Sequence, residues 1–433
     1  EPVSENRYAP PTPEPTPEDT AGAVELTYPT AIALGGAHSC VLLNNGRIKC
    51  WGRNDNGEIG SGTPIGDRLD ITIDNNIYEP EYVVGIDNAI SISSGGSHTC
   101  ALLDDNTISC WGSSYFGQLG KKGRWGFNTH QIVDGISDVI EVGTGVSHTC
   151  VLLNDGNIKC WGDNHLVQVQ KNAASADYCP FEDQLSNVGD NYKNCVYLPE
   201  TIIGDWVSDA TSISAGNGHS CVTLSNGEVI CWGHNYYGQI GAGTSEYLST
   251  KYDVRCPGVL SSSIRYNCIQ PIESSGISTA MKIIVGLNHN FAVLQNGNVM
   301  GWGSNQSGQL GDGTSTSQST PVEIGVLSGI TKIVAGSSHS CAIFQGNSVK
   351  CWGNNQYGQL GNGTFGDGTE SISPVGVIGL ADVEDIATRG NHTCVIENKQ
   401  VKCWGYNNYG QLGNESEMNA GSPLNSKPVI VDL

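Results

Sequence analysis

The sequence predicts an all-β protein, a seven-bladed β-propeller built from four-stranded antiparallel blades. One phrase, in which His-Ser/Thr-Cys is followed ten residues later by Cys-Trp-Gly, occurs with variations seven times. No window shows the 3.6-residue apolar period of an amphipathic helix, and the 57 glycines among 433 residues favour short strands joined by tight turns. Seven small sheets bury both of their faces only by stacking, and a closed ring achieves this while leaving few exposed edges.

The repeat period is read from the histidines. They are separated by 60, 50, 71, 70, 50 and 53 residues, which indicates a unit of about 50 residues with insertions in the first, third and fourth units. The tryptophans follow the same rhythm at positions 51, 111, 161, 232, 302, 352 and 404.

Each unit reads as four strands. In the sixth unit these are TKIVAG, SCAIF, VKCWG and a strand beginning Pro-Val, with a turn at residues 345–347 between the second and third. The first strand near Thr30 has no Pro-Val strand before it, and the last Pro-Val strand, at residues 428–431, has no unit after it. We therefore expect the N- and C-terminal strands to close one shared blade.

Residues 1–24 differ from the rest of the chain. The first 22 hold six of the 17 prolines and five acidic residues, which is typical of an extended linker or stalk. We assign residues 1–24 to this linker and residues 25–433 to the propeller. The start at Glu1 rather than methionine leads us to expect that a leader was removed or never included.

The phrase GxxH(S/T)CxLxxxGxxxCWGxNxxGQLG resembles the regulator-of-chromosome-condensation repeat family, whose members fold as seven-bladed propellers. The resemblance extends from about residue 28 to residue 433, and the paired cysteines suggest a bacterial-type secreted variant. It implies a fold more than a function, because relatives include a nuclear exchange factor, a plant UV-B photoreceptor and a secreted β-lactamase inhibitor.

The cysteines of the repeat are predicted to form cross-strand disulfides. Cys40 and Cys50 lie opposite one another in a hairpin if its loop is Asn44-Asn45-Gly46, with glycine at the position that favours a left-handed conformation. The seventh pair is nine residues apart and needs a two-residue loop at 398–399. The predicted bonds are Cys40–Cys50, Cys100–Cys110, Cys150–Cys160, Cys221–Cys231, Cys341–Cys351 and Cys394–Cys403.

The fifth unit lacks both cysteines and has Phe291 and Gly301 instead, as expected if the pair acts together. The remaining four cysteines lie in the insertions, where Cys179–Cys195 and Cys256–Cys268 are the nearest pairs among three arrangements. A zinc site is disfavoured, because a cross-strand pair supplies only two sulfurs.

Charge and cysteine content limit the partners and the compartment. A net charge of −22 argues against nucleic acid as a partner, and no apolar run is long enough for direct membrane insertion. Sixteen cysteines indicate an oxidising compartment, so we expect the protein to be secreted or displayed on a cell surface. The same features exclude a nuclear exchange factor.

The repeated histidines and tryptophans are interpreted as structural. A seven-fold His position is expected to satisfy polar groups where blades meet, and a Ser beside a His on one strand points to the opposite face. We therefore predict no catalytic residue, no metal and no cofactor. GQLG is replaced by VQVQ at residues 167–170, where a different loop geometry is expected.

Insertions at residues 61–78, 171–197 and 242–268 all fall between GQLG and the Pro-Val strand, and hence on one face. Aromatic residues in the third and fourth units' insertions, and the basic-aromatic loop KKGRWGF of the second unit, are candidate binding residues, although the insertions could equally be decoration or cover the end of the ring. The candidates are Lys121, Arg124, Trp125, Tyr178, Phe181, Tyr192, Tyr197, Tyr247, Tyr252 and Tyr266.

These observations favour a non-enzymatic, exported propeller that binds a protein or glycan on a cell surface or extracellular structure. One alternative is a secreted inhibitor that caps a hydrolase. Another is a structural subunit of a filament or surface layer, with self-assembly through the N-terminal arm.

Overall fold

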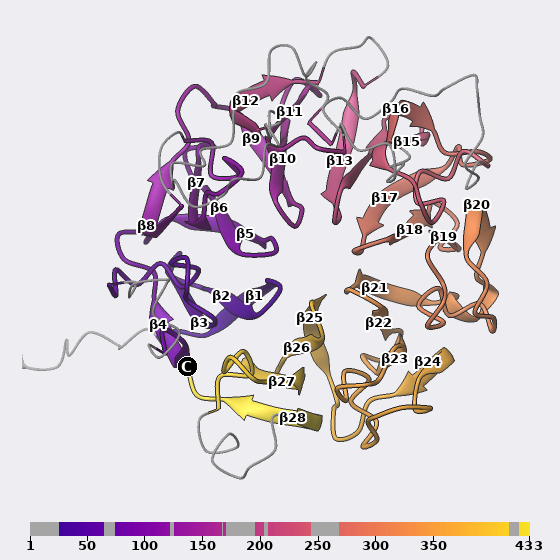
Figure 1. Ribbon diagram of the computed structural model, residues 1–433. Helices are drawn as coiled ribbons and strands as arrows, with labels where there is room; N and C mark the ends of the chain where they lie inside the picture. The colour runs from indigo at the N-terminus through magenta and orange to yellow at the C-terminus, as the bar shows by residue number, and fades with distance from the viewer. Residues whose placement is uncertain are drawn as a thin grey trace, which may run out of the picture.

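Seven four-stranded sheets stand around a common axis in the computed structural model (Figure 1). The structure describes residues 26–64, 74–121, 125–166, 168–169, 195–202, 207–243, 268–414 and 424–433. Within these ranges the secondary structure is 28 strands and one 3-10 turn, η1 (Gly325–Leu327). The predicted all-β, seven-bladed architecture is confirmed. None of the described segments forms a helix that could cross a lipid bilayer.

Each blade is formed by one continuous stretch of chain, with its first strand innermost and its fourth outermost (Figure 1). Blades 1 and 2 contain β1 (Pro29–Leu34), β2 (His38–Leu43), β3 (Ile48–Gly52), β4 (Ile77–Tyr82), β5 (Ala89–Ser94), β6 (His98–Leu103), β7 (Ile108–Ser113) and β8 (Gly126–Ile132). Blades 3 and 4 contain β9 (Val139–Thr144), β10 (His148–Leu153), β11 (Ile158–Asp163), β12 (Cys195–Thr201), β13 (Ala210–Ala215), β14 (His219–Leu224), β15 (Val229–His234) and β16 (Cys268–Glu273).

Blades 5 to 7 complete the ring. They contain β17 (Ala280–Val285), β18 (His289–Leu294), β19 (Val299–Gly303), β20 (Gln318–Glu323), β21 (Ile330–Ala335), β22 (His339–Phe344), β23 (Val349–Gly353), β24 (Ser371–Gly376), β25 (Val383–Arg389), β26 (His392–Glu397), β27 (Gln400–Tyr406) and β28 (Leu424–Val431).

The predicted sharing of one blade by the two chain ends is wrong. β28 pairs with β27 of its own unit, and β1 to β4 form a complete sheet without it. The reason is that each Pro-Val strand pairs with the Cys-Trp-Gly strand just before it, so every unit finishes its own blade. The ring closes instead where β1 packs against β25 and β26. There the Ser39 hydroxyl donates to the Gln411 carbonyl (2.7 Å) and the Ile32 N–H to Asp385 (3.3 Å).

The hairpin registers agree with the predictions. Cys40 pairs with Cys50, and Gly46 has a φ of +76° in the three-residue loop. In blade 7, Glu397 pairs with Gln400 across the predicted two-residue turn, whose residues Asn398 and Lys399 have φ values of 51° and 62°. Two positive φ values in succession are the signature of a type I′ turn.

All six predicted cysteine pairs of the blades are disulfide-bonded, with Cα–Cα distances of 4.0–4.1 Å. In blade 5, Phe291 is fully buried and its ring packs beside Gly301, where an added Cβ would lie 3.3 Å from the ring. One aromatic side chain thus fills the space of a disulfide. Cys195 is also disulfide-bonded, but Cys179 and Cys256 lie outside the described residues, so the pairing in the insertions remains a prediction.

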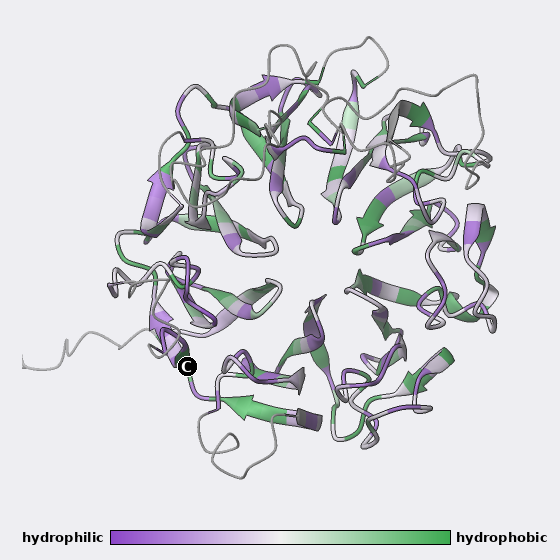
Figure 2. Ribbon diagram, viewed as in Figure 1, coloured by the Kyte–Doolittle hydropathy of each residue, from purple (hydrophilic) through white to green (hydrophobic). Residues whose placement is uncertain are grey.

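The hydrophobic core is divided among the interfaces between blades rather than gathered at one centre. Figure 2 shows apolar segments in strands all around the ring. At the seam between blades 7 and 1, for example, Ile32 and Trp51 pack with Val401 and Leu412. All seven repeat tryptophans are fully buried, so each blade is stabilised mainly by its two neighbours.

Candidate interaction face

The up-and-down course of each blade places two kinds of connection on the same face of the ring. The turn between the first and second strands and the loop between the third and fourth strands both lie at this end, which we call the loop face. The three predicted insertions fall within third-to-fourth connections, and most of their residues lie outside the described ones. The second-to-third hairpins and the connections between blades lie on the opposite face.

Side-chain amides hold the third-to-fourth loops in place. In blade 6 the Leu360 N–H donates to Asn355 Oδ1 (3.0 Å), and the Tyr357 N–H donates to Gln359 Oε1 (2.9 Å). The backbone carbonyl of Gln359 in turn accepts a hydrogen bond from Trp404 Nε1 of the next blade (2.9 Å). The Asn and Gln side chains of the NxxGQLG phrase therefore fix the conformation of the loop, and its Gln carbonyl bonds the loop to the following blade.

The loop of blade 3 was expected to differ because VQVQ replaces GQLG. Its described residues instead repeat the same contacts. The Leu166 N–H donates to Gln168 Oε1 (2.7 Å), Val169 N–H donates to Asn164 Oδ1 (2.9 Å), and Trp232 Nε1 donates to the Gln168 carbonyl (2.9 Å). The expectation was wrong at these contacts, because the glutamine that makes them is retained.

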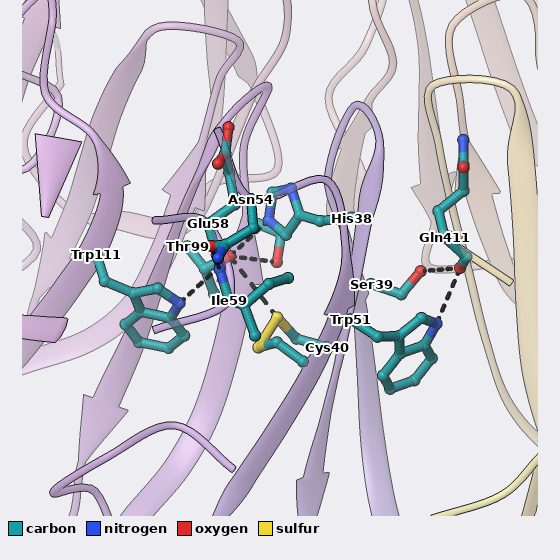
Figure 3. Close-up of a disulfide and its surroundings, with 12 residues drawn as sticks. His38, Ser39, Cys40, Trp51, Asn54, Glu58, Ile59, Thr99, Trp111 and Gln411 are labelled. Atoms are coloured by element: carbon teal, nitrogen blue, oxygen red, sulfur yellow. Dashed lines mark hydrogen bonds between the residues drawn. A yellow bond between two sulfur atoms is a disulfide. The ribbon is translucent and has the colours of Figure 1, made fainter. Parts of the chain in front are cut away.

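The seven repeat histidines link the blades in a closed ring of side-chain hydrogen bonds. In Figure 3, His38 Nε2 lies 2.8 Å from Thr99 Oγ1 of blade 2, while Ser39 points the other way to the Gln411 carbonyl of blade 7. Seven bonds of this kind join each blade to the next, from His38–Thr99 through His98–Thr149, His148–Ser220, His219–Asn290, His289–Ser340, His339–Thr393 and His392–Ser39.

Blade 5 reveals the direction of these bonds. There Asn290 replaces Ser or Thr, its Nδ2 donates to the Gln239 carbonyl (2.6 Å), and its Oδ1 faces His219 Nε2 (2.9 Å). An amide oxygen only accepts, so the imidazole must carry its proton on Nε2. The hydroxyl of Ser340 likewise gives its one proton to the Gln309 carbonyl (2.9 Å) and accepts from His289.

Burial keeps these histidines neutral. It lowers the pKa of His38, His148, His289, His339 and His392 to about 3 and that of His219 to about 4. A neutral imidazole whose proton is committed to a structural bond is unsuited to proton transfer near neutral pH. Among the described residues, no three His, Cys, Asp or Glu side chains gather as they would around a metal.

Aromatic side chains line the loop face over blades 6, 7 and 1. The Tyr357 and Tyr406 rings are 4.9 Å apart, and those of Tyr406 and Tyr409 are 6.3 Å apart. The guanidinium of Arg53 lies 5.4 Å from the Tyr409 ring and is paired with Asp55 at 2.6 Å. The result is an arc of rings that ends on a cation.

A second aromatic group lies over blades 2 and 3. Trp125 is 44% exposed, and its ring is 5.1 Å from that of Tyr115. Tyr115 contacts Phe116 (4.7 Å), which contacts His165 of blade 3 (5.9 Å). On blade 4, Tyr236 is 56% exposed on the same face.

The predicted binding residues have different outcomes. Trp125 is partly exposed on the loop face. Lys121 is also partly exposed, but its Nζ lies 3.9 Å from Asp134, which belongs to the connection between blades 2 and 3. Tyr197 lies within β12, is only 4% exposed and packs with Cys195 and Phe116, so it is not a surface contact residue. β12 begins at Cys195 and β16 at Cys268, so these strands include the ends of two predicted insertions. The other candidates, Arg124, Tyr178, Phe181, Tyr192, Tyr247, Tyr252 and Tyr266, lie outside the described residues.

Sequence reasoning missed the aromatic residues inside the repeat itself. The residue before the first glycine of GQLG is Phe116, Tyr237, Tyr357 or Tyr409 in four of the blades. The aromatic type at this one position was the available signal.

Comparison with protein families gives a consistent match along the chain. A model of the regulator of chromosome condensation (RCC1) repeat matches residues 45–102, 296–343 and 348–396. A second model of the same repeat matches residues 30–58, 89–118, 139–166, 210–239, 282–309 and 330–359.

Among curated proteins, the ultraviolet-B receptor UVR8 of Arabidopsis thaliana is 25% identical over 288 residues, which cover 66% of this chain and 56% of the receptor. The human E3 ubiquitin-protein ligase HERC2 is 24% identical over 221 residues, covering 50% of this chain and 4% of the ligase. The chain thus spans little more than half of the receptor and a small part of the ligase.

Two solved structures share the fold. Yeast RCC1 (Prp20), solved bound to Kap60, superposes with a TM-score of 0.67 at 18% identity, covering 94% of this chain and 85% of that chain. Human WBSCR16 gives a TM-score of 0.68 at 20% identity, covering 89% and 95%. At these identities the likeness shows the fold alone.

Proposed function

Because this chain belongs to the regulator of chromosome condensation (RCC1) repeat family, we propose that it is a non-enzymatic binding module that holds a protein partner on its loop face. The observation that carries this proposal is the set of partly exposed aromatic residues along that face, from Trp125 and Tyr236 to Tyr357 and Tyr409. Tyr, Trp and Arg are enriched at the centres of protein interfaces.

The scaffold beneath these residues supports the proposal. The loops are fixed by side-chain amide bonds and by tryptophan bonds from the next blade, so little conformational entropy is lost when a partner binds. Yeast RCC1, which shares the fold, is seen bound to a protein. The neutral histidine ring has no group poised for catalysis.

The proposed setting is outside the cell or on its surface. Six cross-strand disulfides are stable in an oxidising compartment and rare in the reducing cytosol. A net charge of −22 favours a partner that offers basic groups to the rings and carboxylates, rather than nucleic acid.

The test is a capture experiment with the disulfides intact, followed by direct binding of each captured protein to variants. On the loop face, Trp125→Ala and Tyr236→Ala should each weaken affinity by about tenfold or more. Met281→Ala and Val326→Ala are matched controls, because these side chains are 61% and 59% exposed on the opposite face.

The proposal is supported if the control variants bind a captured partner with an affinity within about twofold of the unsubstituted protein while the loop-face variants bind it more weakly. Loop-face variants that bind every captured partner as tightly as the controls do would overturn it. If glycans but no proteins bind this face, the proposed protein partner would be replaced by a glycan.

A further inference from the structure

Blade 7 has an arginine where the other six blades have a glycine. The first residue of the GxxH turn is Gly35, Gly95, Gly145, Gly216, Gly286 or Gly336, and in blade 7 it is Arg389. The glycine is needed in the usual turn, since an added Cβ at Gly336 would lie 2.6 Å from Cε1 of His339. The turn of blade 7 differs accordingly, with Arg389 paired to His392 and Gly390 at a φ of +55°.

The side chain of Arg389 reaches across the axis of the ring. Its Nη1 donates to the backbone carbonyl of Thr144 at 3.0 Å. Arg389 ends β25 of blade 7 and Thr144 ends β9 of blade 3, and both are innermost strands (Figure 1). Blades 1 and 2 lie between them in the ring, so the bond spans the centre rather than a blade interface.

One edge of the guanidinium has no partner among the described residues. Nε and Nη2 are buried and make no hydrogen bond to any described residue. These two nitrogens lie on the same side of the guanidinium, which is the edge that binds two oxygens in parallel. Among the described residues, no carboxylate forms an ion pair with Arg389.

The surroundings leave this charge uncompensated. Burial, followed by the charge of Arg389, lowers the pKa of His98 well below its usual value, so this nearby imidazole is neutral. Burial lowers the pKa of Arg389 itself only to about 10, which leaves the guanidinium charged at neutral pH. An unpaired buried charge is costly, and a bound anion removes that cost. Arg389 as a whole is partly exposed, whereas Nε and Nη2 themselves are buried.

We propose that Arg389 forms an oxyanion site at the axis of the propeller, where Nε and Nη2 bind two oxygens of one small oxyanion. Nη1 stays on the Thr144 carbonyl and fixes the orientation of the fork. The ligand class is phosphate or carboxylate, whose paired oxygens match this edge.

The test titrates inorganic phosphate, and separately acetate, into the disulfide-intact protein at constant ionic strength, with sodium chloride as the reference salt. Calorimetric binding and the unfolding temperature are both measured. The unsubstituted protein should bind at least one of the two probes saturably and unfold at a higher temperature in its presence. Arg389→Gly, which restores the residue of the other six blades and so should fold, should lose this response.

Two further variants sharpen the result. Arg389→Lys keeps a charge without the fork and should weaken binding by about tenfold or more. Arg53→Gln removes an arginine elsewhere on the loop face and should bind as the unsubstituted protein does. The proposal is overturned if neither probe binds saturably, if folded Arg389→Gly binds equally well, or if Arg389→Lys matches the unsubstituted protein.

Discussion

Replacing His339 with glutamine should change how stability depends on pH in a direction set by the neutral histidine ring. Burial holds the pKa of His339 at about 3, against 6.5 for a free imidazole. A histidine whose pKa is lowered by folding is protonated first in the unfolded chain. Its contribution to stability is therefore complete above pH 6.5 and is lost as the pH falls from 6.5 toward 3.

The size of the effect follows from proton linkage. Protonation of one free imidazole stabilises the unfolded state by about 0.1 kcal/mol at about pH 7.5 and by about 2 kcal/mol at about pH 5. Glutamine takes up no proton, so His339→Gln escapes this loss. The variant is less stable at pH 7.5 because its bond to Thr393 is disturbed. The deficit should then shrink by about 2 kcal/mol by pH 5.

The assay is equilibrium unfolding in urea, followed by tryptophan fluorescence with the disulfides intact, at several pH values. His165→Gln is a control of opposite sign. Burial lowers the pKa of His165, but the hydrogen bond and charge of Asp163 outweigh it and raise that pKa. Stability from His165 is present below 6.5 and lost as the pH rises, so its deficit should grow in acid. A His339→Gln deficit that stays constant or widens toward pH 5 would refute the reasoning.

Three further outcomes are expected in the same unfolding assay. Removing one disulfide by the double substitution Cys341→Ala and Cys351→Ala should lower the free energy of unfolding by about 2 to 3 kcal/mol, and an unchanged urea midpoint would contradict a stabilising role for this bond. Gly286→Ala should destabilise by about 1 to 3 kcal/mol, because the new Cβ would lie 2.6 Å from the unit's own imidazole, whereas Gly325→Ala meets open space and should be nearly neutral. Trp404→Phe should cost about 1 to 3 kcal/mol through the lost bond to the preceding loop, and a neutral result would show that this bond is dispensable.

Much of the fold could be predicted because the repeat encodes it locally. The spacing of Cys40 and Cys50 fixed both the hairpin register and the position of Gly46, and the shorter spacing in blade 7 fixed a different turn. These are relations between residues close in sequence. Because the unit occurs seven times, each of these relations can be compared between units.

Ring closure could not be read in this way. Whether residues 428–431 pair with their own unit or with the first one depends on which strand ends a blade, and the repeat pattern fits both choices. The loop of blade 3 was also misjudged, because the letters around Gln168 changed while the residue that makes the contacts did not.

The candidate sites depended on contacts between distant blades. The aromatic arc joins Tyr357 to Tyr409 and Arg53, which are far apart in the chain and adjacent only after the ring closes. In the sequence, Arg389 directly precedes Gly390, which resembles the first glycine of the GxxH turn in the other units. Its place as the substitute for a glycine became clear only when the turn itself was seen.

The seam between blades 1 and 7 also has a mechanical consequence. Six joints between neighbouring blades are covalent, since the chain runs through them. At the seventh, the described residues are joined by packing and by hydrogen bonds such as those of Ser39 and Trp51 to the Gln411 carbonyl. A pulling force applied between the first strand and the last acts on this joint directly. The ring is therefore expected to open under tension at this joint, while the six cross-strand disulfides stay within their own blades.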